Sequence, residues 1–340
     1  MLRVRPIAER DYPALLQIAE DSGHGFTSLP IDEKLLKSKI QRSVRSFAKA
    51  VEQPGDELYL MVLEETETGE VVGTCAIEAA VGIEDAFYHY RLGKDVHVSP
   101  QLEIRREVNT LTLCNDYTGA AELCTLYLKP EWRKGDNGRF LSMCRFLLLA
   151  AFPERFGDKV IAEMRGVSDA SGASPFWQWL EDHFFGIDFP TADYLTGIGD
   201  KVFVAELMPR HPIYVNLLSP EAQAVVGEVH ENTKPALRLL QSQGFRCQGY
   251  VDIFDAGPTV ECQRSEIKAV RESASLTLKV GDHDGDDKVI VTNANLKDLT
   301  IIRASAKVDR EAGEIFLSQA DADALARNSG ATVWVLGMNR

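Results

Sequence analysis

The sequence predicts a mixed α/β (α+β) fold followed by a small β-rich module. Apolar runs and amphipathic helices alternate over the first 265 residues, whereas short strands separated by turns dominate residues 275–340. With 340 residues, 45% of them hydrophobic, the chain has ample material for a large core. We expect one domain over residues 1–265, with an insertion at about 150–228, and a separate module over residues 275–340.

The elements of the first half follow from apolar periodicity. Leucines at helical spacing predict a first helix, and a loop rich in Gly and small polar residues precedes a second, amphipathic helix. Alternating apolar residues then predict antiparallel strands. The expected elements are a strand at 2–7, helices at 11–20 and up to about 51, a hairpin at 58–64 and 71–81, and a strand pair at roughly 96–99 and 109–114.

Residues 122–139 combine an apolar strand, a Pro turn, a Gly-bearing loop and a helix that begins near Gly138. The first turn of a helix presents backbone N–H groups and the positive end of its dipole, which suits a phosphate or pyrophosphate. Cationic side chains add to this positive charge. The candidate cradle consists of Arg133, Lys134, Gly135, Gly138 and Arg139. It lacks the Lys-Ser/Thr end of a Walker A loop and the three glycines of a dinucleotide fingerprint, so a solvated basic turn is the alternative.

A second informative segment is Asn232-Thr-Lys-Pro-Ala-Leu-Arg-Leu-Leu-Gln-Ser-Gln-Gly-Phe245. Asn232 is a good helix N-cap, and Pro235 lies in the first turn, where a missing N–H costs little. Gly244 is placed to end the helix. An apolar strand at 250–254 is expected next.

The two segments, in this order, resemble the acyl-CoA motif and the second half of the fold of GCN5-related N-acetyltransferases (GNATs). The resemblance implies a GNAT-like acyl-CoA N-acyltransferase fold. Two positions depart from the pattern. Asp136 replaces the first glycine of the usual pyrophosphate loop, and Leu240 replaces a tyrosine that many of these enzymes use as the acid for the CoA thiolate.

More specific motifs resemble the arginine N-succinyltransferase family from residue 1 to at least residue 265. They are Thr27-Ser-Leu-Pro, Glu122-Leu-Cys-Thr-Leu, Ala162-Glu-Met-Arg-Gly, Ser174-Pro-Phe-Trp, Ala205-Glu-Leu-Met-Pro-x-His-Pro-Ile-Tyr and Asp252-Ile-Phe-Asp-x-Gly-Pro-Thr. The resemblance implies a succinyl-CoA cosubstrate, the α-amino group of L-arginine as acceptor, and no permanently bound cofactor. It also implies a succinyl-CoA contact at Leu126 and a histidine proton donor at His230.

The resemblance leaves alternatives open. L-Ornithine is a second acceptor that the resemblance leaves open. The chain forms either a homo-oligomer or one subunit of a hetero-oligomer of similar chains, such as the alpha subunit of a two-subunit arginine/ornithine succinyltransferase. A weakly active or non-catalytic subunit is the alternative function. The place of Asp136 in the cofactor loop favours that alternative, whereas the presence of His230 argues against it.

His230 also makes chemical sense without the family. It comes two residues before Asn232, at the start of the helix that should face the thioester. A histidine with an ordinary pKa of about 6.5 suits proton transfer near neutral pH. It would supply the acid that Leu240 cannot. A surface histidine at a helix start is the alternative.

The remaining candidates have less specific signals. Glu122 begins the core strand, where related enzymes place a base for the attacking amine. Asn232 is counted with the donor-binding residues because it begins the second helix. Candidate substrate-binding residues are a loop histidine, two carboxylates for a guanidinium and one cation for a carboxylate: His24, Glu163, Glu206 and Arg165. The aromatic run 174–180 either packs in a core or shapes an acceptor pocket.

Composition excludes several classes. A net charge of −14 argues against nucleic acid and anionic membranes as partners. The 6 cysteines include no Cys-x-x-Cys, so neither a zinc site nor a disulfide framework is indicated. No apolar run could span a bilayer, and the N-terminus has no signal-peptide pattern. We expect a reduced, cytoplasmic enzyme without a metal.

The tail predicts a β-rich module. Strands are expected at 288–292, 299–304, 314–317 and 332–336, with a short helix at 318–327. This pattern resembles half of a swapped-hairpin barrel of some transcription factors, but acidic surroundings disfavour DNA binding. The acidic loop that begins at Gly281 lacks the spacing of an EF-hand. A β-rich cap or oligomer contact is expected.

Overall fold

The computed structural model describes residues 1–22, 29–169, 172–197 and 202–338. The helices are α1 (Tyr12–Ser22), α2 (Glu33–Ala48), α3 (Asn137–Ala151), α4 (Pro175–Leu180), α5 (Phe189–Gly197), α6 (Val202–Leu207), α7 (Pro220–Val225), α8 (Lys234–Ser242), α9 (Lys268–Glu272) and α10 (Gln319–Ala324). The strands are β1 (Leu2–Pro6), β2 (Leu58–Glu65), β3 (Val71–Glu78), β4 (His89–Ser99), β5 (Ile104–Cys114), β6 (Ala121–Leu128), β7 (Lys159–Glu163), β8 (Ile213–Tyr214), β9 (Arg246–Val251), β10 (Pro258–Gln263), β11 (Ala274–Val280), β12 (Asp287–Thr292), β13 (Ile301–Asp309), β14 (Glu314–Leu317) and β15 (Thr332–Gly337).

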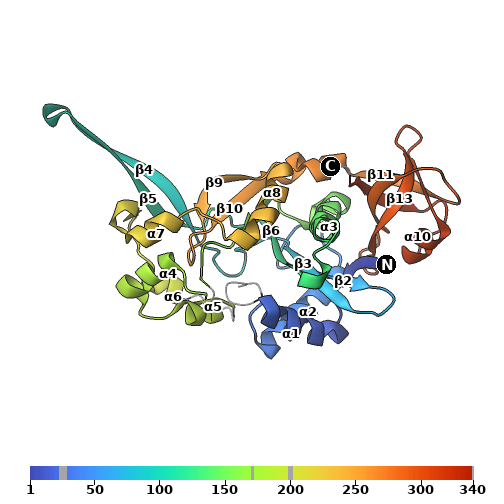
Figure 1. Ribbon diagram of the computed structural model, residues 1–340, viewed down its shortest axis with the longest axis horizontal. Coiled ribbons are helices and arrows are strands. Elements are labelled where there is room, and N and C mark those ends of the chain that lie inside the picture. The colour runs from blue at the N-terminus through green and yellow to red at the C-terminus, as the bar shows by residue number, and fades with distance from the viewer. Residues whose placement is uncertain (23–28, 170–171, 198–201, 339–340) are drawn as a thin grey trace.

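The strands of the described chain hydrogen-bond into one 15-stranded arrangement. Its central part runs β1-β2-β3-β6-β7-β10-β9-β4-β5, and all neighbours in it are antiparallel except β6 and β7. Figure 1 shows this sheet crossing the middle of the molecule, with α1 and α2 on one side and α3 on the other.

The two sides of the sheet follow from strand alternation. In β2, Leu58, Leu60 and Val62 pack with α1 and α2, whereas Tyr59, Met61 and Leu63 pack with α3. Successive side chains of a strand point to opposite faces, so a continuous apolar strand can bury both faces.

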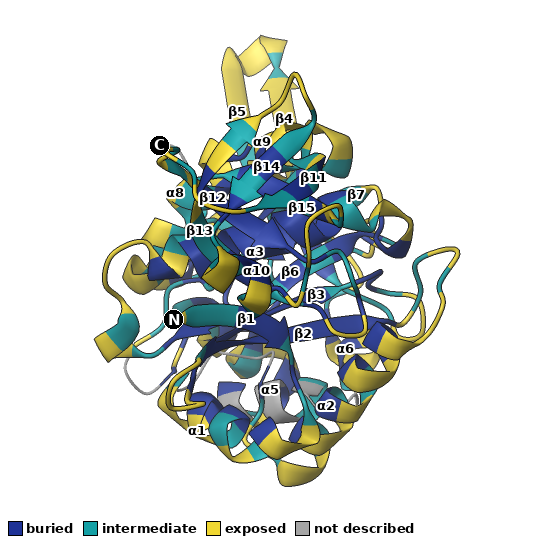
Figure 2. Ribbon diagram, turned by 90° about the vertical axis from the view of Figure 1, so that its right-hand side faces the viewer, coloured by how far each residue is buried: buried dark blue, intermediate teal, exposed yellow. Residues whose placement is uncertain are grey.

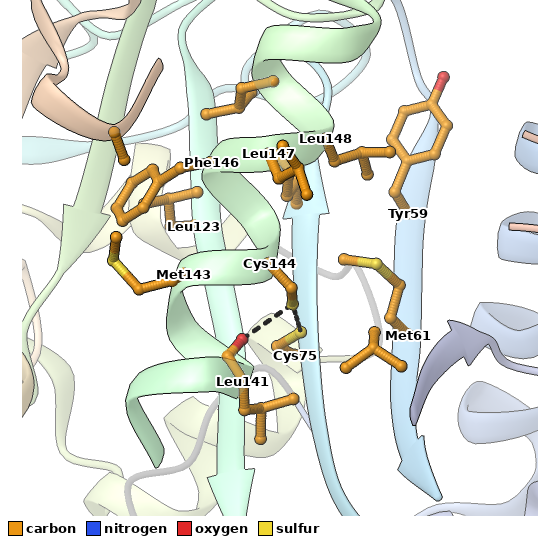
Figure 3. Close-up of a cluster of buried hydrophobic side chains, with 14 of the residues drawn as sticks. Tyr59, Met61, Cys75, Leu123, Leu141, Met143, Cys144, Phe146, Leu147 and Leu148 are labelled. Carbon is orange, nitrogen blue, oxygen red and sulfur yellow. Dashed lines mark hydrogen bonds between the residues drawn. The ribbon is translucent and has the colours of Figure 1, made fainter. Parts of the chain in front are cut away.

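Helix α3 is the centre of the larger core. It is apolar on almost every side because the sheet covers one face and later parts of the chain cover the others. Figure 3 shows Cys144 of this helix against Cys75 of β3, with the sulfurs 3.7 Å apart and no disulfide. The Cys144 thiol also donates to the Leu141 carbonyl at 3.0 Å, and burial raises its pKa. These thiols act as small core residues.

The C-terminal module is a small barrel. Strand β12 pairs with both β15 and β13, which closes the set β11 to β15. Closure removes exposed sheet edges. The barrel joins the rest through β1, whose Arg3 and Val4 pair with Ile302 and Ile301 of β13. Figure 1 accordingly shows the N-terminus beside the barrel.

Strands β4 and β5 form an arm that projects far from the molecule (Figure 1). Their neighbours pair only near its base, at Tyr90 and Arg91 of β4 and at Thr110 and Leu111 of β5. The outer part is largely exposed (Figure 2), including Val98 and Leu102, which are 61% and 68% exposed. A two-stranded ribbon is marginal in water by itself.

The insertion has its own core. Phe176 and Trp177 of α4 are buried with Phe189 and Phe254, and the Trp177 indole donates to the Ile187 carbonyl at 3.1 Å. The aromatic pair at 176–177 therefore packs in a core and does not line an open pocket.

Most predicted elements are present, and four details differ from the predictions. The arm strands are far longer than 96–99 and 109–114, the strand expected at 250–254 is β9 at Arg246–Val251, and β11 was not expected. Asn232 is not the N-cap of α8. A 3-10 turn, Glu231–Thr233, precedes this helix, and His230 caps that turn. Gly244, with φ of 102°, ends α8 as expected. In the described ranges, no helix is long and apolar enough to cross a membrane.

Candidate active site

Parallel strands β6 and β7 separate shortly after they begin. They pair only at Ala121 with Val160 and Glu122 with Ile161, while β6 stays bonded to β3 on its other side. No strand of the described chain pairs with this edge of β6 after Glu122. Backbone N–H and C=O groups there need partners, so a linear ligand with amide groups fits along the edge.

A bulge distorts β6 at this place. Its register with β3 shifts between Thr74 and Ala76, and Thr125 has φ of 53°, which is rare for a β-branched residue. Strain of this kind persists only where the surroundings impose it, and it clusters at functional sites. The half-buried Leu126 follows Thr125 directly, so the bulge lies next to the position at which a succinyl-CoA contact is expected.

Strand β6 leads directly into the predicted phosphate cradle. A 3-10 turn at Pro130–Trp132 and an exposed loop precede α3, and Gly135 has φ of 55°. The Arg133 Nε atom donates to the Leu128 carbonyl at 2.8 Å, which anchors this cation to the end of β6. Lys134 lies over the Trp132 ring, and Gly138 and Arg139 lie in the first turn of α3. The N–H groups of that turn lack intrahelical acceptors and suit an anion.

His230 is held by its own backbone and by the turn that it caps. Its N–H donates to the Arg165 carbonyl at 2.9 Å, and its Nδ1 accepts from the Asn232 N–H at 3.2 Å. A neutral imidazole that accepts at Nδ1 carries its proton on Nε2, so Nε2–H is the donor left for a substrate. Burial, followed by the positive charge of Arg165, lowers the pKa of His230.

The structure brings Arg165 next to His230. Val229 and Gly166 form an isolated β-bridge, so the segment before α8 lies against the end of β7. The guanidinium of Arg165 is half-buried and donates to the Ser168 hydroxyl at 2.9 Å, and its buried Nε has no hydrogen-bond partner among the described residues. Burial lowers the pKa of Arg165. Such a cation suits a substrate carboxylate.

Asp255 supports this arrangement, and the sequence analysis assigned it no role. Its carboxylate accepts from the Gly166 N–H at 2.7 Å and from the Gly257 N–H at 2.8 Å, and burial raises its pKa. A Cβ at Gly166 would lie 2.6 Å from the Asp255 carbonyl oxygen, and one at Gly257 would lie 2.2 Å from the Met164 carbonyl oxygen. Only glycines allow the two turns to approach this closely. The signal was present in the motif Asp252-Ile-Phe-Asp-x-Gly-Pro-Thr.

Two candidate carboxylates lie on the paired strands. Glu122 begins β6 opposite Glu78 of β3, and Glu163 ends β7 opposite Thr259 of β10. The Glu163 Oε1 atom is 2.9 Å from Nε2 of His89, a fully buried histidine that the sequence analysis missed. Burial lowers the pKa of His89 to about 4, and the contact lacks hydrogen-bond geometry. His89 is therefore neutral at pH 7, and the contact is not an ion pair.

Glu206 is a candidate that the structure does not bring to this site. Glu206 lies on an exposed face of α6, and none of the hydrogen bonds or ion pairs of the described residues joins it to another candidate. His24 lies outside the described residues. Within the described part of the chain, no cluster of three or more His, Cys, Asp or Glu side chains could hold a metal ion.

Comparisons with known proteins identify relatives over nearly the whole chain. Residues 2–269 match the family model described as "Arginine N-succinyltransferase beta subunit". Relatives named arginine N-succinyltransferase are 46% identical over 98% of this chain and 96% of their own in Enterobacter sp. strain 638, and 46% identical over 96% and 95% in Salmonella schwarzengrund strain CVM19633. The solved structure of arginine/ornithine succinyltransferase subunit AI from Pseudomonas aeruginosa is 35% identical with a TM-score of 0.90, covering 100% of this chain and 99% of that one.

These findings confirm the predicted acyltransferase class, and the strands and helices confirm the predicted mixed α/β fold with a β-rich C-terminal part. The match to the family model and the sequence identities over nearly the full length are both stronger than a shared fold alone would produce. The chain belongs to the arginine N-succinyltransferase family.

Proposed function

We propose that the chain transfers the succinyl group of succinyl-CoA to the α-amino group of L-arginine, giving N2-succinyl-L-arginine and CoA in arginine catabolism in the cytoplasm. The observation that carries the proposal is the continuous path from the open edge of β6 to the first turn of α3, with His230 held beside the end of β7. L-Ornithine is a second acceptor of the same chemical class.

In the proposed mechanism the donor lies along β6. Its pantetheine amides bond to the strand backbone near Leu126, and its phosphates lie at the loop formed by Arg133, Lys134, Gly135, Gly138 and Arg139. Asn232 lies in the turn that His230 caps and contributes its backbone N–H there. Donor phosphates at such a loop are bound in ground and transition states alike.

The neutral α-amine attacks the thioester carbonyl, and the C–S bond breaks as the new amide bond forms. Glu122, at the start of β6, accepts the proton that the amine loses. His230 in its imidazolium form, which carries protons on both ring nitrogens and so no longer accepts from the Asn232 N–H, donates its Nε2 proton to the departing thiolate; the lowered pKa makes this proton easier to transfer. The enzyme contributes positioning in addition.

The acceptor contacts are assigned by charge. Arg165 binds a carboxylate of succinyl or of arginine, and its half-buried, cationic side chain supports this role. Glu163 and His24 are the proposed contacts for the rest of arginine, whereas Glu206, on an exposed face of α6, is left out of the proposal. A guanidinium prefers a bidentate carboxylate.

The alternative is a weakly active or non-catalytic subunit of a hetero-oligomeric succinyltransferase. The bond from the Asn232 N–H to Nδ1 supports catalysis, because in the neutral imidazole it leaves the proton on Nε2 and so fixes which nitrogen can donate. We also propose that similar chains assemble into a homo- or hetero-oligomer through the β4–β5 arm, whose apolar tip is exposed. Light scattering on a chain with residues 94–107 replaced by a short turn would show a smaller assembly; an unchanged mass would argue against the arm.

We further propose that residues 1–265 form the catalytic domain, with the insertion at about 150–228 contributing to the acceptor side, and that residues 275–340 form the separate module. The core cluster around Trp177 and Phe254 supports the insertion as one packed unit.

Donor preference tests the proposal. Succinyl-CoA should be used with much higher kcat/KM than acetyl-CoA, because a site that pairs the succinyl carboxylate leaves its own polar groups unmatched with acetyl. Equal kcat/KM for the two thioesters, with L-arginine held constant, would contradict it.

A further inference from the structure

Arg303 extends from the C-terminal barrel to the beginning of α3. It lies on β13, and its Nη2 atom donates to the Asn137 side-chain carbonyl at 2.8 Å. Its guanidinium is 5.2 Å from the centre of the Phe140 ring. Asn137 in turn donates to the Trp132 carbonyl at 3.1 Å. A residue of the barrel is thus tied to both sides of the loop at 133–136.

The position of Arg303 is rigid. Ile290 and Leu336 of the barrel are buried in the same core cluster as Phe140 and Phe146 of α3. Because this packing fixes the barrel against the helix, the guanidinium is placed by the core and not by a loop. A preorganised cation loses little further freedom when an anion binds.

The charge of Arg303 has no ion-pair partner in the described part of the chain. Its hydrogen bond goes to an uncharged amide, although the side chain is half-buried. Burial lowers its pKa, and the negative charge of Asp136 opposes that shift. A partly buried charge without a counter-charge destabilises the unliganded protein, and an anionic ligand would relieve that cost.

The same cation accounts for Asp136. This exposed aspartate occupies the N-cap position of α3 but makes no capping hydrogen bond with its side chain. A carboxylate at this place would repel the phosphates of an acyl-CoA. Arg303 supplies a compensating positive charge near this helix start.

We propose that Arg303 is a donor-binding residue: it extends the phosphate cradle of α3, so that the C-terminal barrel forms part of the acyl-CoA site. The inference rests on the proposed use of a CoA thioester and is independent of the acceptor. The packing of the barrel against α3 then affects the affinity for the acyl-CoA donor.

Calorimetric titration with CoA, without any acceptor, tests this role. Arg303→Gln keeps a donor for Asn137 but removes the charge, and it should weaken CoA binding by about tenfold or more, since a lost charged contact is typically worth that much. Arg303→Lys keeps the charge and should lose much less. Arg310→Gln is the matched control, because Arg310 is an exposed arginine of the same barrel whose hydrogen bond goes to the Glu272 carbonyl.

Pantetheine lacks the phosphates of CoA, so it distinguishes the loss of a phosphate contact from a general loss of the binding site. Its inhibition of the enzyme should be equal in wild type and Arg303→Gln. Wild-type CoA affinity in Arg303→Gln, or equal losses for CoA and pantetheine, would overturn the role of Arg303. Failure of the wild-type chain to bind CoA would instead count against the proposed function.

A second variant keeps the test valid if Arg303→Gln does not fold. Asp136→Asn removes the exposed acid beside Arg303 and should strengthen CoA binding several-fold. Unchanged or weaker binding by this variant would contradict the placement of the phosphates between Asp136 and Arg303.

Discussion

At the scale of single residues, the role of His230 depends on a hydrogen bond that sequence cannot reveal. The sequence could nominate this histidine from its place before a helix. It could not predict that the Asn232 N–H occupies Nδ1, because that bond arises from a 3-10 turn that replaces the expected Asn232 cap. His230 and Asn232 are alternative capping residues for the backbone N–H groups at this helix start. The conformation of the turn decides which side chain caps them.

Two variants of His230 separate chemistry from capping. Asn in place of His230 keeps an acceptor at the position of Nδ1, so the thermal midpoint should stay near that of the wild type, whereas Ala loses a cap that is typically worth about 1 kcal/mol. Both should lower kcat by roughly 10²–10⁴-fold if the imidazole is the acid. A fully active His230→Asn enzyme would contradict the assignment.

The pH dependence provides an independent check on His230. Because its folded-state pKa is lowered, the imidazolium that donates the proton decreases tenfold per pH unit above that pKa. The reactive free amine increases by the same factor over this range. The wild-type kcat/KM for L-arginine should therefore be nearly flat from neutral pH up to the pKa of the amine, whereas that of His230→Asn should rise with pH. Parallel profiles would argue against His230 as the acid.

The cradle arginines should act mainly on the donor. Arg133→Ala and Arg139→Ala remove cations that bind phosphates equally in ground and transition states, so KM for succinyl-CoA should rise while kcat changes little. Steady-state kinetics with each substrate varied in turn measures both effects. A KM effect confined to L-arginine would place these residues on the acceptor side.

At the scale of elements, predictability follows the strength of the hydrophobic pattern. Strands β2 and β3 are continuous apolar runs and were predicted closely. The arm strands β4 and β5 are polar over most of their length, since neither face meets a core, and only their apolar fragments were expected. The bulge at Thr125 and the separation of β6 from β7 depend on neighbours distant in sequence, so local patterns carry no sign of them.

The junction between β7 and the turn at 255–257 should control the geometry of the site. In Gly166→Ala, the new Cβ would overlap Asp255 and displace the segment that follows β7, which carries the Arg165 carbonyl that binds the His230 N–H. We expect kcat to fall roughly tenfold or more, since small misplacements of catalytic groups are costly.

Gly337→Ala is the matched control for Gly166→Ala, because a Cβ at Gly337 meets no atom within 4 Å. It should leave kcat and the thermal midpoint near their wild-type values. Near wild-type kcat in Gly166→Ala as well would show that this junction does not position His230.

At the scale of the whole molecule, the sequence predicted the order of the two parts but not how they meet. A β-rich tail could be expected from its turns and short strands. Its pairing through Ile301 and Ile302 with β1, and the contact of Arg303 with Asn137, join positions that are far apart in the sequence. Such contacts depend on the assembled fold, which explains why Asp136 looked like a defect in the sequence and has a compensating partner in the structure.

The most direct test of the account is the activity of the purified chain without any other subunit. It should convert succinyl-CoA and L-arginine into equal amounts of free CoA and a product whose fragmentation in mass spectrometry places the succinyl group on the α-nitrogen. CoA release no faster than the uncatalysed rate, from a folded chain that binds CoA, would contradict the proposal and identify a non-catalytic subunit.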